Sequence, residues 1–225
     1  FRNVLKKEEM KSFISFLKQD KEIAEKISCY SEFVSLLTAH RGSFSEFLKK
    51  CICEDENAYI KLKAANKDIP EAVRKNAEAE LALFTELTAV SAEFLWESSG
   101  YEGYIPTFEN TYTDFNALYH ERLENVSTLG YGIFASHGMF RVENNRIIPV
   151  EVADRISVDN FIGYENERRT VLENTRALTE GRPAQNVLLC GDAGTGKSST
   201  VKACANYYYD KGVRLIELRK DQLFS

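Results

Sequence analysis

Residues 186–198 read Asn-Val-Leu-Leu-Cys-Gly-Asp-Ala-Gly-Thr-Gly-Lys-Ser, an apolar run that leads into a glycine-rich loop. The run suits a strand that is buried on both faces. The apolar spacing after Gly196 predicts a helix, and residues 213–218 predict a second strand, which would complete one β-α-β unit. The loop is a full match to the pattern G-x-x-x-x-G-K-[ST]: Gly191, Asp192, Ala193, Gly194, Thr195, Gly196, Lys197 and Ser198.

Each residue type in this loop has a role in binding a phosphate. Glycines at positions 194 and 196 can adopt backbone conformations that cost other residues energy, so that successive N–H groups point at one anion. The start of the following helix adds unpaired N–H groups and the positive end of its dipole. We therefore predict a nucleotide-phosphate site over residues 191–199, in which Lys197 binds the phosphates and Ser198 is a Mg²⁺ ligand next to Ser199. An ordinary glycine-rich turn is the competing interpretation.

The amino-acid sequence of the loop resembles that of a known protein family. Gly194-Thr195-Gly196-Lys197-Ser198 resembles the G-T-G-K-[ST] ending common in AAA-type ATPases. Upstream, Asp159-Asn160-Phe161-Ile162-Gly163-Tyr164 resembles the AAA segment whose backbone lies against the adenine. The resemblance therefore implies that Phe161, Ile162 and Gly163 contact the base.

Residues 151–224 as a whole resemble a bacterial family of AAA-type ATPases that is catalogued only as a domain of unknown function. The residues that carry this resemblance are the loop with Ser198-Ser199, Asn174-Thr175, Gly181-Arg182-Pro183-Ala184, Asn186-Val187-Leu188-Leu189 and Arg214-Leu215-Ile216-Glu217. The resemblance implies ATP as substrate, Mg²⁺ as cofactor and assembly of the full-length protein into a homo-oligomer. ATP binding and hydrolysis would drive conformational work on a protein or nucleic-acid partner.

The sequence departs from that family in the parts needed for hydrolysis. Hydrolysis requires a second apolar strand that ends in an acidic pair, and an arginine from a neighbouring subunit. Neither can be placed after Ser198, because only 27 residues follow it. We therefore expect an N-terminal portion of a longer ATPase, which by itself binds nucleotide weakly or not at all and does not hydrolyse it. No residue is assigned a catalytic role.

The first 150 residues show a different pattern of apolar residues, one typical of helices. Apolar residues at helical spacing predict helices that include Met10, Phe13, Ile14 and Leu17, then residues 23–37, then one long helix from Pro70 to Trp96, and a short helix through Leu118 and Leu123. Residues 130–150 predict two strands around the turn at Glu143-Asn144-Asn145, with Pro149 placing the second strand at an edge.

Charge and periodicity divide the chain at the same place. Residues 1–150 hold 18 Lys and Arg against 23 Asp and Glu, whereas residues 151–225 hold 11 of each. The predicted fold is α+β. Residues 1–150 would form a mostly helical accessory domain that ends in a β-hairpin and recognises the partner, and residues 151–225 would form the first part of an AAA-type α/β nucleotide-binding domain.

Composition excludes several classes. A hydrophobic content of 44% excludes a largely disordered chain, and a net charge of −5 lacks the basic excess typical of nucleic-acid binders. Five cysteines favour a reducing compartment over a disulfide framework. The sequence contains no signal peptide and no long apolar run, which predicts a cytoplasmic protein without a membrane segment.

Three other functions remain open from the residues alone. One is a P-loop kinase or other phosphotransferase. Another is a nucleotide-gated interaction module with little hydrolysis. In the third, residues 1–150 form an independent binding module and the loop segment is a passenger.

Overall fold

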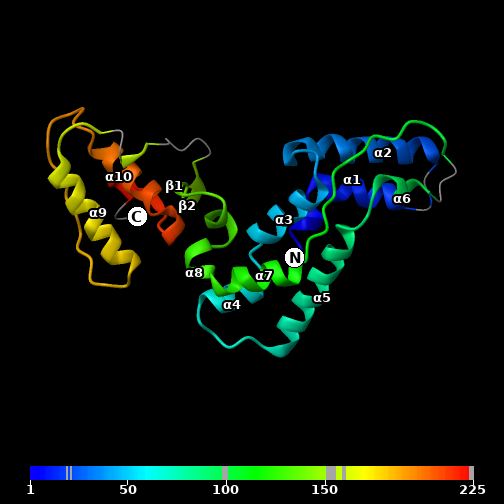
Figure 1. Ribbon diagram of the computed structural model, residues 1–225, viewed down its shortest axis with the longest axis horizontal. Coiled ribbons are helices and arrows are strands. Elements are labelled where there is room, and N and C mark those ends of the chain that lie inside the picture. Colours follow the sequence, from blue (N-terminus) through cyan, green and yellow to red (C-terminus); the bar gives the residue numbers. More distant parts are fainter. Residues whose placement is uncertain (19, 21, 98–100, 151–155, 159–160, 223–225) are drawn as a thin grey trace. The chain divides into compact units, whose positions relative to one another are not determined.

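The computed structural model describes residues 1–18, 20, 22–97, 101–150, 156–158 and 161–222. The chain folds into two compact units, unit 1 (Phe1–Val126) and unit 2 (Ser127–Ser225). In the described residues, unit 1 is helical, whereas unit 2 combines helices with a small sheet (Figure 1). The α+β class predicted from the sequence is therefore confirmed.

Unit 1 is built from α-helices of 5 to 17 residues, and a long connection joins α6 to α7. Helices α1 and α2 pack side by side along their length. The α-helices are α1 (Glu8–Leu17), α2 (Ile23–Leu36), α3 (Phe44–Glu54), α4 (Ala58–Ala64), α5 (Glu71–Leu87), α6 (Ala92–Trp96) and α7 (Phe115–Glu124), and α8 (Val126–Leu129) leads into unit 2.

Aromatic side chains fill the core of unit 1. The Phe33 ring is fully buried and lies 5.0 Å from the Phe13 ring and 5.1 Å from the Phe44 ring, measured between centroids. A second group joins Trp96 of α6 to Phe16 of α1 and Tyr30 of α2, at 5.1 and 5.4 Å. Because such edge-on and tilted pairs add to the burial of apolar area, these rings fix α1, α2, α3 and α6 together.

The long helix predicted from Pro70 to Trp96 is divided in two, which corrects the prediction. Helix α5 begins after Pro70 as expected but ends at Leu87, and α6 begins at Ala92. Two polar side chains bind the backbone between the end of α5 and the start of α6. The side-chain amide of Asn110 donates to the carbonyls of Leu87 and Val90, and the Ser91 hydroxyl accepts from the N–H of Phe94 as an N-cap. The stop predicted at residues 98–100 lies outside the described residues.

Helix α1 forms where predicted, but its buried face differs from the predicted one. Met10 and Phe13 are buried as expected, together with Phe16, whereas Ile14 and Leu17 are 38% and 49% exposed. The helical spacing of apolar residues was compatible with burial of either of two neighbouring faces of this helix. The large Phe16 ring is the one that packs on Tyr30 and Trp96.

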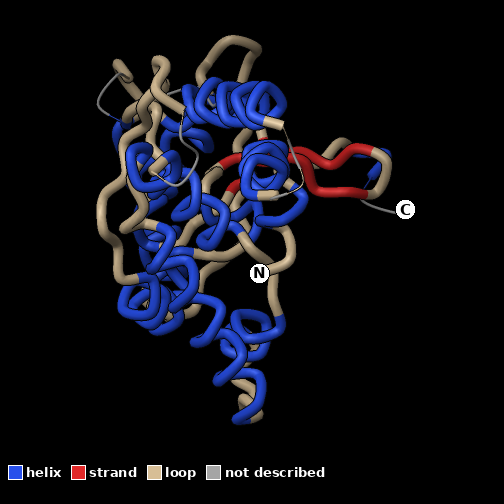
Figure 2. Tube along the Cα trace, turned by 90° about the vertical axis from the view of Figure 1, so that its right-hand side faces the viewer, coloured by secondary structure: helices blue, strands red, loops and turns tan. Residues whose placement is uncertain are grey.

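Unit 2 contains a three-stranded sheet of order β2-β1-β3 (Figure 2). Strands β1 (Met139–Glu143) and β2 (Arg146–Pro149) form the predicted antiparallel hairpin, and β2 is an edge strand. Asn144 and Asn145 make the turn with φ of 48° and 58°, which asparagine tolerates better than most residues. Strand β3 (Leu215–Glu217) runs parallel to β1, with Met139 opposite Leu215. Two helices complete the unit, α9 (Glu165–Thr179) and α10 (Lys197–Tyr207).

The run at residues 186–190, predicted as a strand buried on both faces, forms no strand and is largely exposed. Val187 is 48% exposed and Leu188 is 87% exposed, and only Leu189 packs against the cluster between α9 and α10. A central parallel strand needs a neighbour on each side. In the described part of the chain, β3 pairs with β1 instead, so the β-α-β unit predicted around the loop is not formed.

The two units divide at Val126 and Ser127, earlier than the division that charge and periodicity predicted at residue 150. The difference is the hairpin, which the sequence placed in the N-terminal domain. Parallel pairing of β1 with β3 brings it into the same sheet as the C-terminal strand. The functional division into an accessory and a nucleotide-binding domain stays a prediction.

No helix in the described part of the chain is both long enough and apolar enough to cross a membrane.

Candidate functional site

The glycine-rich loop connects the run at 186–190 to the first turn of α10. Gly191, Gly194 and Gly196 have φ of 149°, 83° and 80°, values that side chains with a Cβ rarely adopt. Gly196 is the residue that precedes α10, so the loop ends at the helix N-terminus. In the described structure the N–H groups of Gly194 and Gly196 donate no hydrogen bond. The loop therefore offers free backbone donors beside a helix N-terminus.

The Lys197 side chain folds back over the loop. Its ammonium donates to the carbonyls of Gly191 and Asp192, at 2.9 and 2.6 Å, and to the Thr195 hydroxyl at 3.2 Å. The same hydroxyl donates to the Asp192 carbonyl at 2.9 Å. These oxygens hold the positive charge at the mouth of the loop, where a phosphate oxygen could replace them as partner.

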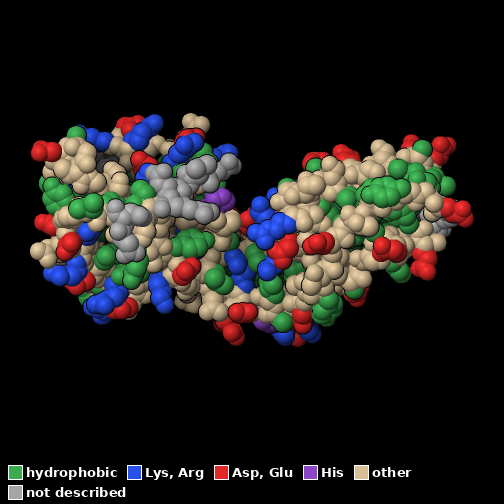
Figure 3. Space-filling model, turned by 45° about the horizontal axis from the view of Figure 1, so that its top comes forward, with side chains coloured by type: hydrophobic (Ala, Val, Ile, Leu, Met, Phe, Trp, Pro, Cys, Tyr) green, Lys and Arg blue, Asp and Glu red, His purple; other side chains and the backbone are tan. Residues whose placement is uncertain are grey.

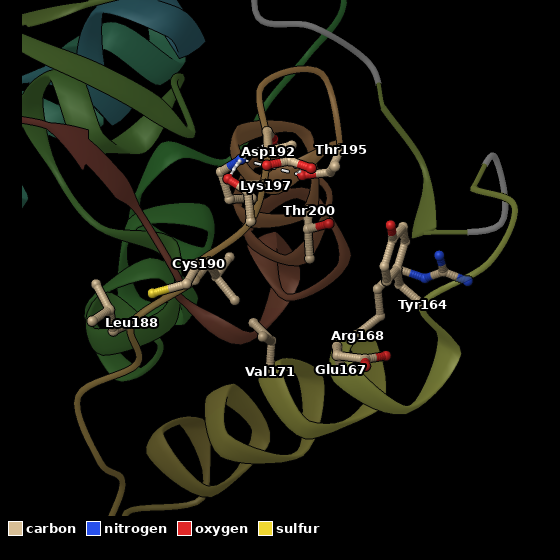
Figure 4. A pocket seen from close by; sticks show the side chains of 12 residues that line it. Tyr164, Glu167, Arg168, Val171, Leu188, Cys190, Asp192, Thr195, Lys197 and Thr200 are labelled. Atoms are coloured by element: carbon tan, nitrogen blue, oxygen red, sulfur yellow. Dashed lines mark hydrogen bonds between the residues drawn. The ribbon is translucent and has the colours of Figure 1, made fainter.

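A cleft of about 410 Å³ lies between the loop and α9 (Figure 4). Lys197, Asp192 and Thr195 gather on one side of it, and Tyr164 and Arg168 lie across from them at the start of α9. The lining residues are Tyr164, Glu167, Arg168, Val171, Leu188, Leu189, Cys190, Gly191, Asp192, Thr195, Lys197 and Thr200.

The predicted loop residues contribute unequally to this cleft. Gly191, Asp192, Thr195 and Lys197 line it. Ala193, Gly194, Gly196, Ser198 and Ser199 do not, and Ser198, predicted as the Mg²⁺ ligand, is exposed. Asp192, which places a carboxylate within an anion-binding loop, is also exposed.

Of the described residues in the segment that resembles an adenine-binding stretch, Tyr164 lines the cleft, whereas Phe161, Ile162 and Gly163 do not. A Cβ added to Gly196 would lie 3.7 Å from the Phe161 ring, so this segment and the loop are neighbours. Arg168 donates to the carbonyl of Gly163, and its guanidinium carbon lies 5.4 Å from the centre of the Phe161 ring. Ile162 is fully exposed. Asp159 and Asn160 lie outside the described residues.

The packing of α9 against α10 supports the cleft from behind. Val171 is buried with Cys204 of α10 and with Tyr208, the residue that follows α10, and Leu189 packs on them. The Cys204 thiol donates to the Thr175 hydroxyl at 3.2 Å. Burial raises the pKa of this thiol despite that bond, so it stays protonated at neutral pH and serves packing.

A two-bond clamp positions the chain that enters the site. The side-chain amide of Asn174 donates to the carbonyl of Gln185 at 2.7 Å, and its oxygen accepts from the N–H of the same residue at 2.9 Å. Asn174 was singled out in the sequence only through the family resemblance. Its structural role is to hold residue 185 beside α9, directly before the run that leads to the loop.

Glu167 and Val171 of α9 are the cleft residues that sequence reasoning missed. Tyr164, Glu167 and Val171 follow the helical spacing i, i+3, i+7, which places them on one face. That spacing was visible in the sequence, but it did not indicate that this face turns toward the loop.

Comparison with known proteins gives a family match for the C-terminal part of the chain. Residues 135–225 match a family described as "Protein of unknown function (DUF815)". The match includes the hairpin, α9, the loop, α10 and β3. No curated protein and no solved structure matches the chain.

Proposed function

We propose that unit 2 binds ATP with Mg²⁺ at the loop of residues 191–199, as part of an AAA-type ATPase. The observation that carries this proposal is the loop itself. It combines glycines at positive φ, free N–H groups at the N-terminus of α10 and a lysine ammonium held at the mouth of an open cleft. The resemblance of residues 151–224 to AAA-type ATPases supports the choice of ATP.

The donors present fit a polyphosphate. Lys197 can exchange its loop oxygens for phosphate oxygens, because its three present partners are two neutral carbonyls and a hydroxyl, and a phosphate bears negative charge. The exposed Ser198 hydroxyl is free to serve a Mg²⁺ ion. Bound ATP would supply the energy for conformational work, and residues 191–199 of this chain would bind and orient its phosphates.

We further propose that this chain binds ATP weakly and does not hydrolyse it. No acidic pair at the end of a second apolar strand is present among the described residues of the site, and Arg168, the arginine that lines the cleft, donates to the carbonyl of Gly163. The full-length protein would be the ATPase, acting on a macromolecular partner as a homo-oligomer.

Binding of a fluorescent ATP analogue in the presence of Mg²⁺ tests the proposal. Lys197→Ala should weaken binding by at least about tenfold, because it removes the ammonium that faces the phosphates. Lys211→Ala is the matched control, since this lysine is exposed outside the cleft and carries the same charge. Equal binding by the Lys197→Ala variant and the wild type would refute the site. ATP turnover by the purified chain that is lost in Lys197→Ala would refute the absence of hydrolysis.

A P-loop kinase or phosphotransferase is the second candidate. The phosphate-binding loop that would hold ATP is common to both functions. Transfer of phosphate from ATP to a small acceptor, in the absence of hydrolysis, would support this function over the first. A nucleotide-gated interaction module would bind ATP and show neither reaction.

A further inference from the structure

One long segment of unit 1 carries no positive side chain. Between Lys75 and Arg122 the sequence has no lysine or arginine, but it has nine aspartates and glutamates. This segment forms most of α5, all of α6, the connection to α7 and most of α7. Glu78 and Glu80 of this segment pair with Arg74 and with the N-terminal ammonium, whereas no lysine or arginine lies next in the sequence to the carboxylates of α6.

The short helix α6 exposes an aromatic ring within this negative segment. Ala92 and Trp96 are each 4% exposed and face the core, whereas Glu93, Phe94 and Glu97 lie on the opposite side of the helix. Phe94 is 66% exposed. The Phe94 ring therefore lies exposed on the same face of the helix as two exposed carboxylates.

The chain just after α6 extends this surface. The Tyr101 ring packs on Trp96, with 5.3 Å between centroids, and the exposed Glu102 and Tyr104 follow. Tyr104 is 85% exposed. We call Glu93, Phe94, Glu97, Glu102 and Tyr104 the α6 patch. In Figure 3 the end of unit 1 that carries α1, α2 and α6 shows hydrophobic and acidic side chains, and the lysines and arginines of this view lie elsewhere.

The carboxylates of the α6 patch differ from other acidic groups of unit 1. Glu8, Glu46 and Glu71 each pair with a lysine one turn away in the same helix. Glu93, Glu97 and Glu102 form no ion pair in the part of the chain that the structure describes. Their charge is available to a partner.

The base of the patch is rigid. Trp96 is held between rings of α1, α2 and the following loop, so the position of α6 is fixed by the core. A partner that binds there orders few side chains of this chain, which lowers the entropic cost of association.

We propose that the α6 patch is a docking surface for a basic amphipathic helix of another protein. Phe94 and Tyr104 would contact the apolar stripe of that helix, and the three glutamates would pair with the lysines or arginines that flank it. The same charges repel nucleic acid and anionic lipid surfaces, so the chemistry selects a protein partner. This inference does not depend on nucleotide binding in unit 2.

Fluorescence anisotropy of a labelled peptide tests the proposal on the whole chain. The probe is an 18-residue peptide with leucine and lysine at helical spacing, and the control probe has the same composition in an order that forms no apolar stripe. The wild-type chain should bind the first peptide at least about tenfold more tightly than the second. Equal affinity for the two peptides would overturn the proposal, because it would show attraction by charge alone.

Two variants with matched changes in charge locate the surface. The triple change Glu93→Gln, Glu97→Gln and Glu102→Gln should weaken binding of the first peptide about tenfold at low salt, because it removes all three partner charges. The control triple Glu8→Gln, Glu46→Gln and Glu71→Gln removes the same charge elsewhere on unit 1 and should change the affinity less than about twofold. Equal losses in the two triples would overturn the proposal.

A third variant tests the aromatic contact. Phe94→Ser should weaken binding at least about fivefold, whereas Leu5→Ser, at a residue 55% exposed outside the patch, should leave it unchanged. Circular dichroism should show that both variants stay folded, since neither side chain is buried. No difference between the two would overturn the role of Phe94.

Discussion

Units 1 and 2 differ in how completely they bury their own apolar side chains. In the described chain, all of the largest fully buried side chains except Phe140 belong to unit 1. Unit 2 leaves Leu188 87% exposed and Leu178 63% exposed, and its helix–helix cluster rests on Val171, Cys204 and Tyr208. Because burial of apolar area is the main favourable term in folding, unit 1 should be the more stable unit and the loop should lie in the less stable one.

The largest expected effect comes from the core of unit 1. Phe33→Ala should lower the free energy of unfolding by about 3–5 kcal/mol, because it leaves a cavity among Phe13, Phe44 and Phe108. Urea unfolding followed by circular dichroism measures this. The control Phe94→Ala, at a ring 66% exposed, should cost about 0.5 kcal/mol or less. Similar costs for the two variants would mean that unit 1 lacks the close-packed core described above.

A smaller effect is expected from the residue that ties unit 2 together. The Arg214 guanidinium donates to five backbone carbonyls, those of Phe134, Tyr209, Val213, Thr128 and Leu129, and lies 4.1 Å from the centre of the Tyr209 ring. Burial lowers its pKa, but arginine stays charged at neutral pH.

Arg214→Lys should therefore destabilise unit 2 by about 2–3 kcal/mol, because an ammonium cannot reach these carbonyls together. Limited proteolysis should cut residues 127–138 and 209–218 faster in the variant while unit 1 stays intact. The exposed Arg219, whose side chain pairs with Asp221, is the matched control as Arg219→Lys. An unchanged cleavage rate in Arg214→Lys would show that unit 2 does not depend on this contact.

The pH dependence of stability gives the smallest effect when it is expressed per pH unit. Burial raises the pKa of the Cys51 thiol in α3 from 9.0 to about 12. Between these values the unfolded chain loses the thiol proton and the folded chain keeps it, so the free energy of unfolding must fall as pH rises. The contribution is at most about 1.4 kcal/mol per pH unit.

Urea unfolding at several pH values from 8.5 to about 11, under reducing conditions, measures this fall. Cys51→Ala should make the fall shallower, whereas Cys190→Ala, at an exposed thiol of unit 2, should leave it unchanged. Buried Tyr30 and Tyr119, whose pKa values are also raised by burial, add to the fall in all three proteins. An identical slope for wild type and Cys51→Ala would contradict burial of this thiol.

Helices α1, α2, α7 and α10 could be predicted from the sequence because their signals are local, whereas α3 and α4 were not predicted. The 3.6-residue spacing and Pro70 before α5 act within a few residues of the element they define. The break at Leu87 was missed because it depends on Asn110, a residue distant in sequence that binds the last carbonyls of α5.

The strands show where such reasoning fails. The hairpin of β1 and β2 was predicted from its own turn residues, but the parallel pairing of β1 with β3 joins segments far apart in the chain. The apolar content of residues 186–190 indicated a strand and could not indicate whether a neighbouring strand would pair with it. For the same reason the loop was found in the sequence, whereas Glu167 and Val171 of the cleft were not.

Amide hydrogen exchange with and without Mg²⁺ and millimolar ATP tests the central claim most directly. If the loop binds phosphate, the amides of residues 191–200 should exchange more slowly with ATP in the wild type, and this protection should be absent in Lys197→Ala. Amides of unit 1 should not change, which provides the internal control. Identical exchange of residues 191–200 with and without ATP in the wild-type chain would contradict nucleotide binding at this site.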